Sequence, residues 1–249
     1  MIKAHKAAVK KEKVQELVFG IHPIVELLKA KRRKLYTIYT TKPTPKAWDL
    51  IAPLLSKETQ IQYVSRDIIT RMAGTTDHQS VIAWAGPFCY RRKFFETDKS
   101  PFLVMLDSVQ DPRNLGAILR TAYCTGAGGV IICQKQGAPL NAAALKASAG
   151  LAEYLEIYEA PSAVAAVQEL KKAGYTLYFT ALNGEDATTV SYQPNLCVVI
   201  GNEATGVAKN LLSSGLTVKL PQRVADISYN ASVAAGIILF MVAHQQGKI

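Results

Sequence analysis

Three short segments of the chain carry polar side chains and glycines in spacings that could bind a ligand beside a reacting group. The first is Asp107–Thr121, which contains Asn114, Gly116 and Arg120. Residues four apart share one face of a helix, so Gly116 would leave room for a substrate beside the Arg120 guanidinium. The simpler interpretation is that Asn114 only caps the helix and that Arg120 pairs with a surface carboxylate.

The second and third segments add a glycine-rich loop and a set of small polar residues. In Gly201–Gly206 two glycines flank Glu203, and glycine lets the backbone approach a ligand closely. The third segment contains Ser228, Asn230 and Ser232, in and after a loop of about ten residues, which is long for such a connection. The simpler interpretations are a tight turn with an exposed glutamate, and side chains that cap the final helix or bond its backbone.

Several other chemistries lack their sequence signals. None of the four histidines follows a predicted strand, which makes general-base catalysis by histidine unlikely to be the chain's chemistry. Gly126–Gly129 follows a helix and precedes a strand, the reverse of a dinucleotide-binding fingerprint, and there is no Walker loop. The reaction must therefore depend on positioning and on a cofactor that carries the reactive group.

The elements that position these segments alternate between apolar strands and amphipathic helices. Such a pattern predicts an α/β domain with a parallel sheet covered on both faces. Ligands of these sheets bind beyond the carboxyl ends of the strands, where the three segments lie. The predicted strands are Phe102–Leu106, Val130–Cys133, Tyr175–Thr180, Leu196–Ile200 and Thr217–Leu220. The predicted helices fall near Leu115–Thr125, Ser162–Lys172, Val207–Leu212 and Ala231–His244.

The N-terminal third predicts a smaller α/β unit. Its predicted elements are a helix at His22–Ala30, a helix through Trp48 and Leu55, and strands at Leu35–Thr40, Ile61–Val64 and Val81–Trp84. A polar segment bracketed by prolines follows, which is typical of a boundary. We therefore expect a basic flexible arm at 1–14, a small domain at 15–86, a linker at 87–100 and a larger domain at 101–249.

The basic charge of the chain is concentrated in its N-terminal part. Residues 1–100 hold 19 basic and 9 acidic side chains, whereas residues 101–249 hold 10 of each. A surface with this excess attracts phosphate backbones whatever their sequence. The N-terminal part therefore predicts contact with a polyanion.

Composition also argues against a membrane protein, a secreted protein and a metal site. The longest apolar stretch, Val233–Ala243, is about half of the ~20 residues that a spanning helix needs, and no apolar segment follows the basic N-terminus. The four cysteines form no C-x-x-C pair. Cys124, Cys133 and Cys197 lie among apolar residues and predict reduced core side chains. We expect a cytoplasmic protein without a metal.

Taken together, the three strand-end segments resemble the motifs of the SpoU (TrmH-type) 2′-O-ribose RNA methyltransferases, of the SPOUT superfamily. The first fits Asn-x-Gly-x-x-x-Arg-Thr at 114–121, and the second fits Gly-x-Glu-x-x-Gly at 201–206. The third fits a hydrophobic-Pro start at 220–221 and Ser-x-Asn-x-Ser at 228–232. The chain departs from the usual third motif at Gln222, Tyr229 and Ala231, where the family has Met, Leu and Val.

The N-terminal unit is similar to the substrate-binding domain of this family, through Gly20-x-His22-Pro23 and the segment His78–Ala83. The resemblance thus covers the chain from about Val18 onward, and its layout is that of members that modify a guanosine of large-subunit ribosomal RNA. It implies RNA as partner. The cations expected to bind RNA are Lys31, Arg32, Arg33, Lys34, Arg91, Arg92, Lys93 and Arg113.

The resemblance implies S-adenosylmethionine as cofactor, a deep trefoil knot in the C-terminal domain and a homodimer with its site near the interface. The implied catalytic residues are Arg120, Asn114, Ser228 and Asn230. The implied cofactor-binding residues are Thr180, Ala181, Leu182, Gly201, Glu203, Gly206, Leu220, Tyr229, Asn230 and Ser232. We expect Arg120 to grip a phosphate beside the target ribose and to stabilise the forming alkoxide.

Two alternatives to ribosomal RNA methylation stay open. One is the same reaction on transfer RNA, although members with that substrate often lack a full N-terminal domain. The other is a non-catalytic RNA-binding protein whose cofactor pocket has decayed, although the polar residues of all three motifs are retained.

Overall fold

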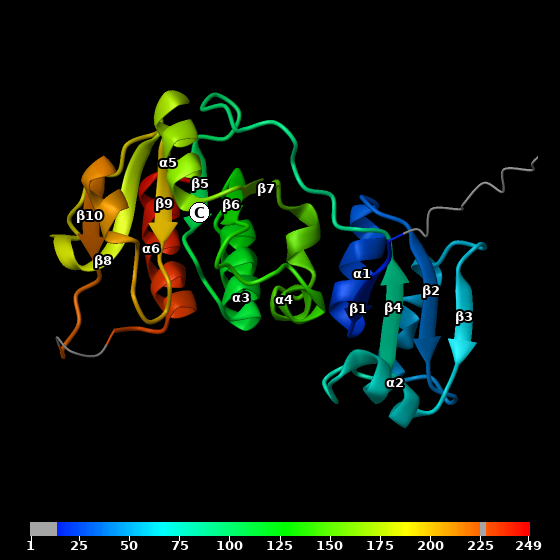
Figure 1. The fold of residues 1–249 in the computed structure, drawn as a ribbon. Coiled ribbons are helices and arrows are strands. Elements are labelled where there is room, and N and C mark those ends of the chain that lie inside the picture. Colours follow the sequence, from blue (N-terminus) through cyan, green and yellow to red (C-terminus); the bar gives the residue numbers. More distant parts are fainter. Residues whose placement is uncertain (1–13, 225–227) are drawn as a thin grey trace, which may run out of the picture.

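The computed structural model describes residues 14–224 and 228–249, and the predicted arm at 1–14 lies outside them except for Val14. The described chain contains two β-sheets with their helices (Figure 1). A four-stranded sheet has the order β1-β4-β2-β3, and a six-stranded sheet has the order β10-β8-β9-β5-β6-β7. The α/β class, the parallel C-terminal sheet and the smaller N-terminal unit are confirmed.

The N-terminal sheet is mixed, with β2 and β3 parallel and the other pairs antiparallel. Its strands are β1 (Glu16–Phe19), β2 (Leu35–Thr40), β3 (Gln60–Tyr63) and β4 (Val81–Ala85), and its helices are α1 (Ile21–Ala30) and α2 (Arg66–Ala73). The sequence did not predict β1 or α2. The predicted helix through Trp48 and Leu55 is two 3-10 helices, Lys46–Leu50 and Ala52–Leu54, and Pro53 in the second cannot continue an α-helix.

In the C-terminal sheet every neighbouring pair of strands is parallel. Its strands are β5 (Phe102–Leu106), β6 (Gly129–Cys133), β7 (Ile157–Ala160), β8 (Thr176–Asp186), β9 (Leu196–Ile200) and β10 (Leu216–Lys219). Its helices are α3 (Pro112–Cys124), α4 (Ala142–Ala147), α5 (Ala163–Lys172) and α6 (Ala231–Gln245), with 3-10 helices η3 (Leu151–Tyr154) and η4 (Lys209–Ser214). The sequence did not predict β7, α4 or η3, and the helix predicted at 207–212 is the 3-10 helix η4.

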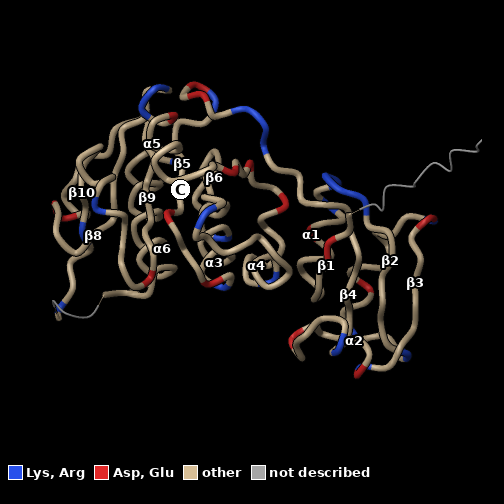
Figure 2. Tube along the Cα trace, viewed as in Figure 1, with Lys and Arg blue, Asp and Glu red and all other residues tan. Residues whose placement is uncertain are grey.

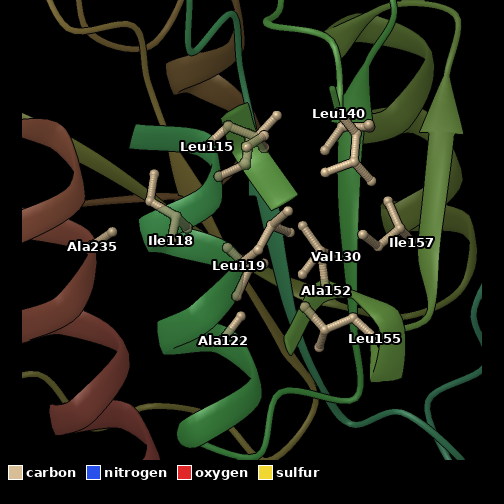
Figure 3. Packing of buried hydrophobic residues seen from close by; sticks show 14 of the residues in the cluster. Leu115, Ile118, Leu119, Ala122, Val130, Leu140, Ala152, Leu155, Ile157 and Ala235 are labelled. Carbon is tan, nitrogen blue, oxygen red and sulfur yellow. The ribbon is translucent and has the colours of Figure 1, made fainter. Parts of the chain in front are cut away.

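The core between α3 and the sheet follows the apolar stripe that the sequence predicts. Leu115, Ile118, Leu119 and Ala122 are all buried, and Figure 3 shows Leu119 on the side of Val130 of β6 and Ile118 on the side of Ala235 of α6. Helix α6 packs on the other flank of α3. Burial on the order of 2 kcal/mol for each large side chain holds α3 in a fixed position on the sheet.

Gly116 serves the contact between α3 and α4. A Cβ at this position would lie 2.2 Å from the carbonyl oxygen of Ala144 and 2.6 Å from the Cβ of Ala147. The prediction that Gly116 leaves room for a substrate beside Arg120 is therefore wrong. Main chain and side chain of α4 fill that space, and only glycine lets the two helices approach so closely.

The segment 87–100 connects the two sheets and packs along β7. The backbone N–H of Arg91 donates to the Ile157 carbonyl at 2.7 Å, and Phe88 and Phe95 are buried. These two aromatic side chains anchor a segment whose polar composition predicted a linker. The segment therefore holds a defined course between the two sheets (Figure 1).

No helix of the described chain is long and apolar enough to cross a bilayer. Its four cysteines are free thiols: Cys133 and Cys197 are buried, as predicted, whereas Cys124 is exposed, contrary to the prediction. Cys124 is the last residue of α3 and lies beyond the buried stripe of that helix.

Replacing Gly116 by alanine tests the α3–α4 contact. We expect Gly116→Ala to lower the free energy of unfolding in urea by about 1–3 kcal/mol, because the new methyl group overpacks the contact. Gly236→Ala is the control, since a Cβ at Gly236 meets nothing within 4 Å and alanine favours a helix by up to ~1 kcal/mol. A Gly116→Ala protein as stable as the wild type would contradict the assigned contact.

Candidate functional site

A pocket of about 440 Å³ opens at the carboxyl ends of β8, β9 and β10, beside the start of α6. This volume lies in the range of sites for small ligands. Nine of the predicted site residues line it: Thr180, Ala181, Leu182, Gly201, Glu203, Gly206, Leu220, Ser228 and Tyr229. Asn114, Arg120, Asn230 and Ser232 do not line it. The pocket thus brings together parts of the second and third motifs with the end of β8.

One wall of the pocket is a segment of β8 that leaves the sheet. Thr217 of β10 pairs with Phe179 of β8, but the next residue, Val218, pairs with Glu185. The five residues 180–184 of β8 therefore have no partner on β10. The Thr180 hydroxyl donates to the Val199 carbonyl at 3.1 Å, which holds the start of the segment against β9. The bulge makes room for the pocket where a regular strand would close it.

The Gly201–Gly206 loop folds back on itself. Asn202 and Gly206 exchange backbone hydrogen bonds of 3.0 and 2.9 Å. A Cβ at Gly201 would lie 2.2 Å from the carbonyl carbon of Gly206 and from the nitrogen of Val207. Gly201 is therefore required by the close approach of the loop's own backbone, and not only by the approach of a ligand, as the sequence suggested.

Glu203 joins this loop to the beginning of α3. Its carboxylate accepts hydrogen bonds from the backbone N–H of Gln110 at 3.1 Å, from that of Asp111 at 3.2 Å and from Asn114 Nδ2 at 2.9 Å. Asn202 Nδ2 also donates to the Ser108 carbonyl at 2.8 Å. The first and second motifs therefore meet through a carboxylate placed at a helix N-terminus, where negative charge is favoured.

Asn114 is not the cap of α3, contrary to the prediction. The helix begins at Pro112, and the Asp111 carboxylate caps it by accepting from the N–H of Arg113 at 2.7 Å. Pro112 at the first helical position allows this early start, because its missing N–H would have no intrahelical partner. Asn114 is instead in the first turn, buried, with its amide turned to Glu203.

The pKa of Glu203 lies below its ordinary value. Burial raises the pKa of this carboxyl, but hydrogen bonds from Asn114 and from backbone N–H groups outweigh that effect. Glu203 is therefore ionised at neutral pH. The simpler interpretation of an exposed glutamate in a tight turn misses its contacts with α3.

The third motif holds the start of α6 at the mouth of the pocket. Asn230 caps the helix, as the simpler interpretation predicts: its Oδ1 accepts from the N–H of Ser232 at 2.9 Å and from the Ser232 hydroxyl at 2.7 Å. The Tyr229 hydroxyl donates to the Pro221 carbonyl at 3.3 Å. These bonds fix the neighbours of Asn230 that line the pocket, Tyr229 and Ala231.

Arg120 is exposed on α3 and lies outside the pocket lining of its own chain. Within the part of the chain that the structure describes, its guanidinium makes no hydrogen bond or ion pair, so the expected alternative of a surface salt bridge is not found there. No residue of the described chain therefore competes with an anion for this guanidinium. Helices α3 and α6 pack together, which places Arg120 on the same layer as the third motif.

The cations predicted to bind RNA fall into two groups. Figure 2 shows the runs at 31–34 and 91–93 as blue stretches of the chain. The exposed members are Lys31, Lys34, Arg92, Lys93 and Arg113, of which Lys34 pairs with Glu58.

The remaining members of those runs are engaged with the C-terminal part of the chain. Arg33 is buried against Glu153, so the prediction that it binds RNA is wrong. Arg32 and Arg91 are half-buried, and both pair with Glu156. A partner far along the chain explains why the sequence did not distinguish these arginines from their exposed neighbours.

Sequence reasoning missed more than half of the pocket lining, 13 of 22 residues. The missed residues are Asn183, Ile200, Asn202, Ala204, Thr205, Val207, Lys209, Leu212, Val218, Gln222, Ala231, Ala234 and Ile238. Those within or directly after the glycine-rich loop could have been found from the motif itself. Those on α6 had a weaker signal, a helix apolar on all sides. No group of three or more possible metal ligands occurs in residues 14–224 and 228–249.

Comparisons with known proteins agree with this layout. Residues 101–240 match the model of the SpoU rRNA Methylase family, and residues 17–90 match that of the RNA 2′-O ribose methyltransferase substrate binding domain. The chain belongs to the SpoU rRNA methylase family. The family, and with it the class of RNA methyltransferase, was predicted from the sequence and is confirmed.

This SpoU family protein is 30% identical to the 23S rRNA (guanosine-2′-O-)-methyltransferase RlmB of Shewanella oneidensis, over 94% of the chain and 99% of the relative. A crystal structure of an RNA 2′-O ribose methyltransferase has a TM-score of 0.80 at 22% identity, covering 95% of this chain and 90% of that one. The SpoU methyltransferase AviRb of Streptomyces viridochromogenes, solved in complex with AdoMet, has a TM-score of 0.74 at 21% identity, covering 93% and 90%.

Replacing Glu203 by glutamine tests the link between the motifs. We expect Glu203→Gln to lower the free energy of unfolding by about 1 kcal/mol at pH 7, a figure discounted for the exposure of the group. Because the pKa is lowered in the folded protein, this difference should persist above pH 4.5, the ordinary value, and vanish as the pH falls below it.

Glu169→Gln is the control for this titration. Glu169 is exposed on α5, and its carboxylate makes no hydrogen bond within the described chain. A loss of stability that is the same at pH 7 and at pH 3 would show that the charge of Glu203 does not hold the two motifs together.

Proposed function

We propose that this protein transfers a methyl group from S-adenosylmethionine to the 2′-hydroxyl of a guanosine ribose in ribosomal RNA. The observation that carries the proposal is the pocket at the carboxyl ends of parallel strands. Nine predicted residues line it, and they come from the end of β8, the Gly201–Gly206 loop and the third motif. The identity to RlmB over nearly the whole chain supports ribosomal RNA and guanosine as the target. Free cysteines and an RNA substrate fit the cytoplasm.

The pocket residues suit the parts of S-adenosylmethionine. Apolar side chains from four elements can pack around the adenine: Leu182, Ile200, Val218, Leu220 and Ile238. Backbone groups of the bulge and of the Gly201–Gly206 loop can bond the adenine edge and the ribose. When bound, this cofactor supplies an electrophilic methyl group on a positively charged sulfur. Asn230 and Ser232 do not line the pocket and support it by holding the start of α6.

The residues of the chain have to align the target oxygen with the methyl carbon and favour loss of the hydroxyl proton. Alignment alone can supply much of the rate, since it removes the entropy cost of a bimolecular encounter. A guanidinium is a poor base, so in this proposal the proton of the 2′-hydroxyl goes to water, while the methyl carbon bonds the oxygen and the sulfur leaves as a neutral thioether. Arg120 instead holds a phosphate next to the target ribose and stabilises negative charge that develops on the 2′-oxygen.

The protein forms a homodimer through α6, with the site near the interface. One side of α6 is buried in the core, whereas Val233, Ile237 and Phe240 are exposed at the spacing of a single helical stripe. A second copy that covers this stripe lies next to α3, the helix that carries Arg120. Arg120 does not line the pocket of its own chain. In the dimer, Arg120 of one copy would instead lie beside the pocket of the other copy. The deep trefoil knot in the C-terminal domain is supported by membership of the family.

Titration with S-adenosylmethionine and a variant of Arg120 test the reaction. We expect the wild type to release heat on binding the cofactor, as a decayed pocket would not. Arg120→Lys should lower methyl transfer to RNA by at least about tenfold, because lysine cannot form the planar two-pronged contact. Its affinity for the cofactor should stay that of the wild type. Full turnover by Arg120→Lys would contradict the role of the guanidinium.

A charge on the exposed stripe of α6 tests the homodimer. In sedimentation equilibrium we expect a mass of twice 27.1 kDa for the wild type and of 27.1 kDa for Phe240→Asp. The aspartate would disrupt the dimer because its charge would be buried in the interface. The control is Val164→Asp on α5, which changes an apolar residue of comparable exposure and should leave the mass unchanged. A monomeric wild type would exclude this interface.

A further inference from the structure

Arg33 joins three segments of the chain across the boundary between the two sheets. Its Nε donates to both carboxylate oxygens of Glu153 in η3, at 3.1 and 3.2 Å, and its Nη2 also bonds Glu153. Its Nη1 donates to Glu16 of β1 at 2.8 Å and to the Gly86 carbonyl after β4 at 3.1 Å. The Phe88 ring lies 5.5 Å from the guanidinium carbon.

The Arg33–Glu153 pair is sealed from water, whereas 34% of the Glu16 side chain is exposed. Only 2% of the Arg33 side chain and 2% of the Glu153 side chain are exposed. Burial raises the pKa of the Glu153 carboxyl, and the Arg33 guanidinium opposes that rise. A buried charge without its partner is strongly unfavourable, so each residue of the pair requires the other.

Further contacts surround this pair on both sides. Arg32 donates to the Leu155 carbonyl at 2.7 Å, and the Tyr154 hydroxyl donates to Glu26 of α1 at 2.6 Å. At the start of α1, Lys146 of α4 donates to Gln79 Oε1 at 2.6 Å, and the N–H of Ile21 donates to the same oxygen at 3.1 Å. The N-terminal unit is thus held at several points, all of them on η3, on α4 or directly after η3.

The two elements that contact the N-terminal unit, η3 and α4, also pack on α3, the helix that carries the first motif. Both η3 and α4 contact α3, and the α4 contact passes through Gly116, four residues before Arg120. The orientation of the N-terminal unit is therefore transmitted to α3 through two short, tightly packed elements. If the unit took other angles, only the fraction of molecules in the right arrangement would bind RNA productively, and the apparent KM would rise by the inverse of that fraction.

We propose that Arg33 is a positioning residue, which through Glu153 fixes the RNA-binding unit at one angle to α3 so that bound RNA presents its ribose at Arg120. This role rests on the proposed function. For Arg33, this positioning role takes the place of the direct RNA contact that was predicted from the basic run at 31–34. In this account Glu153, an acidic residue buried in the other unit, matters for RNA as much as Arg33 does.

A double-mutant cycle on methyl transfer separates the two roles. We expect Arg33→Met and Glu153→Met each to raise the KM for RNA by about tenfold or more, with kcat at saturating RNA and the Kd for S-adenosylmethionine within about twofold of the wild type. The double variant, which leaves no unpaired buried charge, should fold and should be no worse than either single variant. Arg33→Lys keeps the charge and should recover part of the KM.

Lys99→Met is the control, because it removes one exposed cation from the segment 87–100 that pairs only with its neighbour Glu96. If Arg33 binds RNA directly, Glu153→Met keeps the KM of the wild type, and this result would overturn the proposal. Should either single variant fail to fold, Glu153→Gln still distinguishes the two roles because it keeps Arg33: a raised KM supports the positioning role, and a KM equal to that of the wild type overturns it.

Small-angle X-ray scattering tests the arrangement of the two units without depending on the proposed reaction. Within each copy of the wild type the two units should keep the arrangement of Figure 1, and both single variants, at the same oligomeric state, should have a larger radius of gyration as the two units separate. Absence of cofactor binding and methyl transfer in the wild type would remove the proposed function while this scattering difference remained. Variants that keep the scattering curve of the wild type would overturn the proposal.

Discussion

The carboxylate of Glu203 links the first and second motifs, and the arrangement of the site depends on this contact. It accepts hydrogen bonds from two backbone N–H groups before α3 and from the Asn114 amide within it. Both N–H groups precede the helix and have no partner within it, and an anion beside a helix N-terminus is also stabilised by the helix dipole. The loop after β9 is thereby fixed against the loop after β5, and the pocket has one defined wall.

The glycines of the motifs have structural roles that precede any ligand. Gly116 allows α4 to reach the backbone of α3, and Gly201 allows the loop after β9 to close on itself. In both places the nearest atoms belong to the protein's main chain. Residue types typical of a family's binding motif can therefore reflect the packing that builds the site, whose pocket is also lined by neighbours such as Thr205 and Leu182.

Much of the fold could be predicted from local sequence. Strands β5 and β9 are apolar throughout because helices cover both faces, and α3 shows its buried stripe at helical spacing. Strand β7, with the sequence Ile-Tyr-Glu-Ala, has no such signal because only its ends are buried. The helix cap at Asn230 was predictable since a cap is a local interaction.

What the sequence could not give depends on partners far along the chain. Arg33 lies 120 residues from Glu153, and nothing in the run Lys-Arg-Arg-Lys separates the buried arginine from its exposed neighbours. Asn114 lies 89 residues from Glu203, so its role as the link between motifs was hidden behind that of a cap. Pairing over such distances is decided by topology, which the sheet order defines and single residues do not.

Nucleoside analysis of the product tests the central claim most directly. Ribosomal RNA without its native modifications would be incubated with the protein and methyl-labelled S-adenosylmethionine, digested to nucleosides and examined by mass spectrometry. The account predicts label on the 2′-oxygen of guanosine. Label on a base, or no label in RNA despite a protein that binds the cofactor, would contradict it.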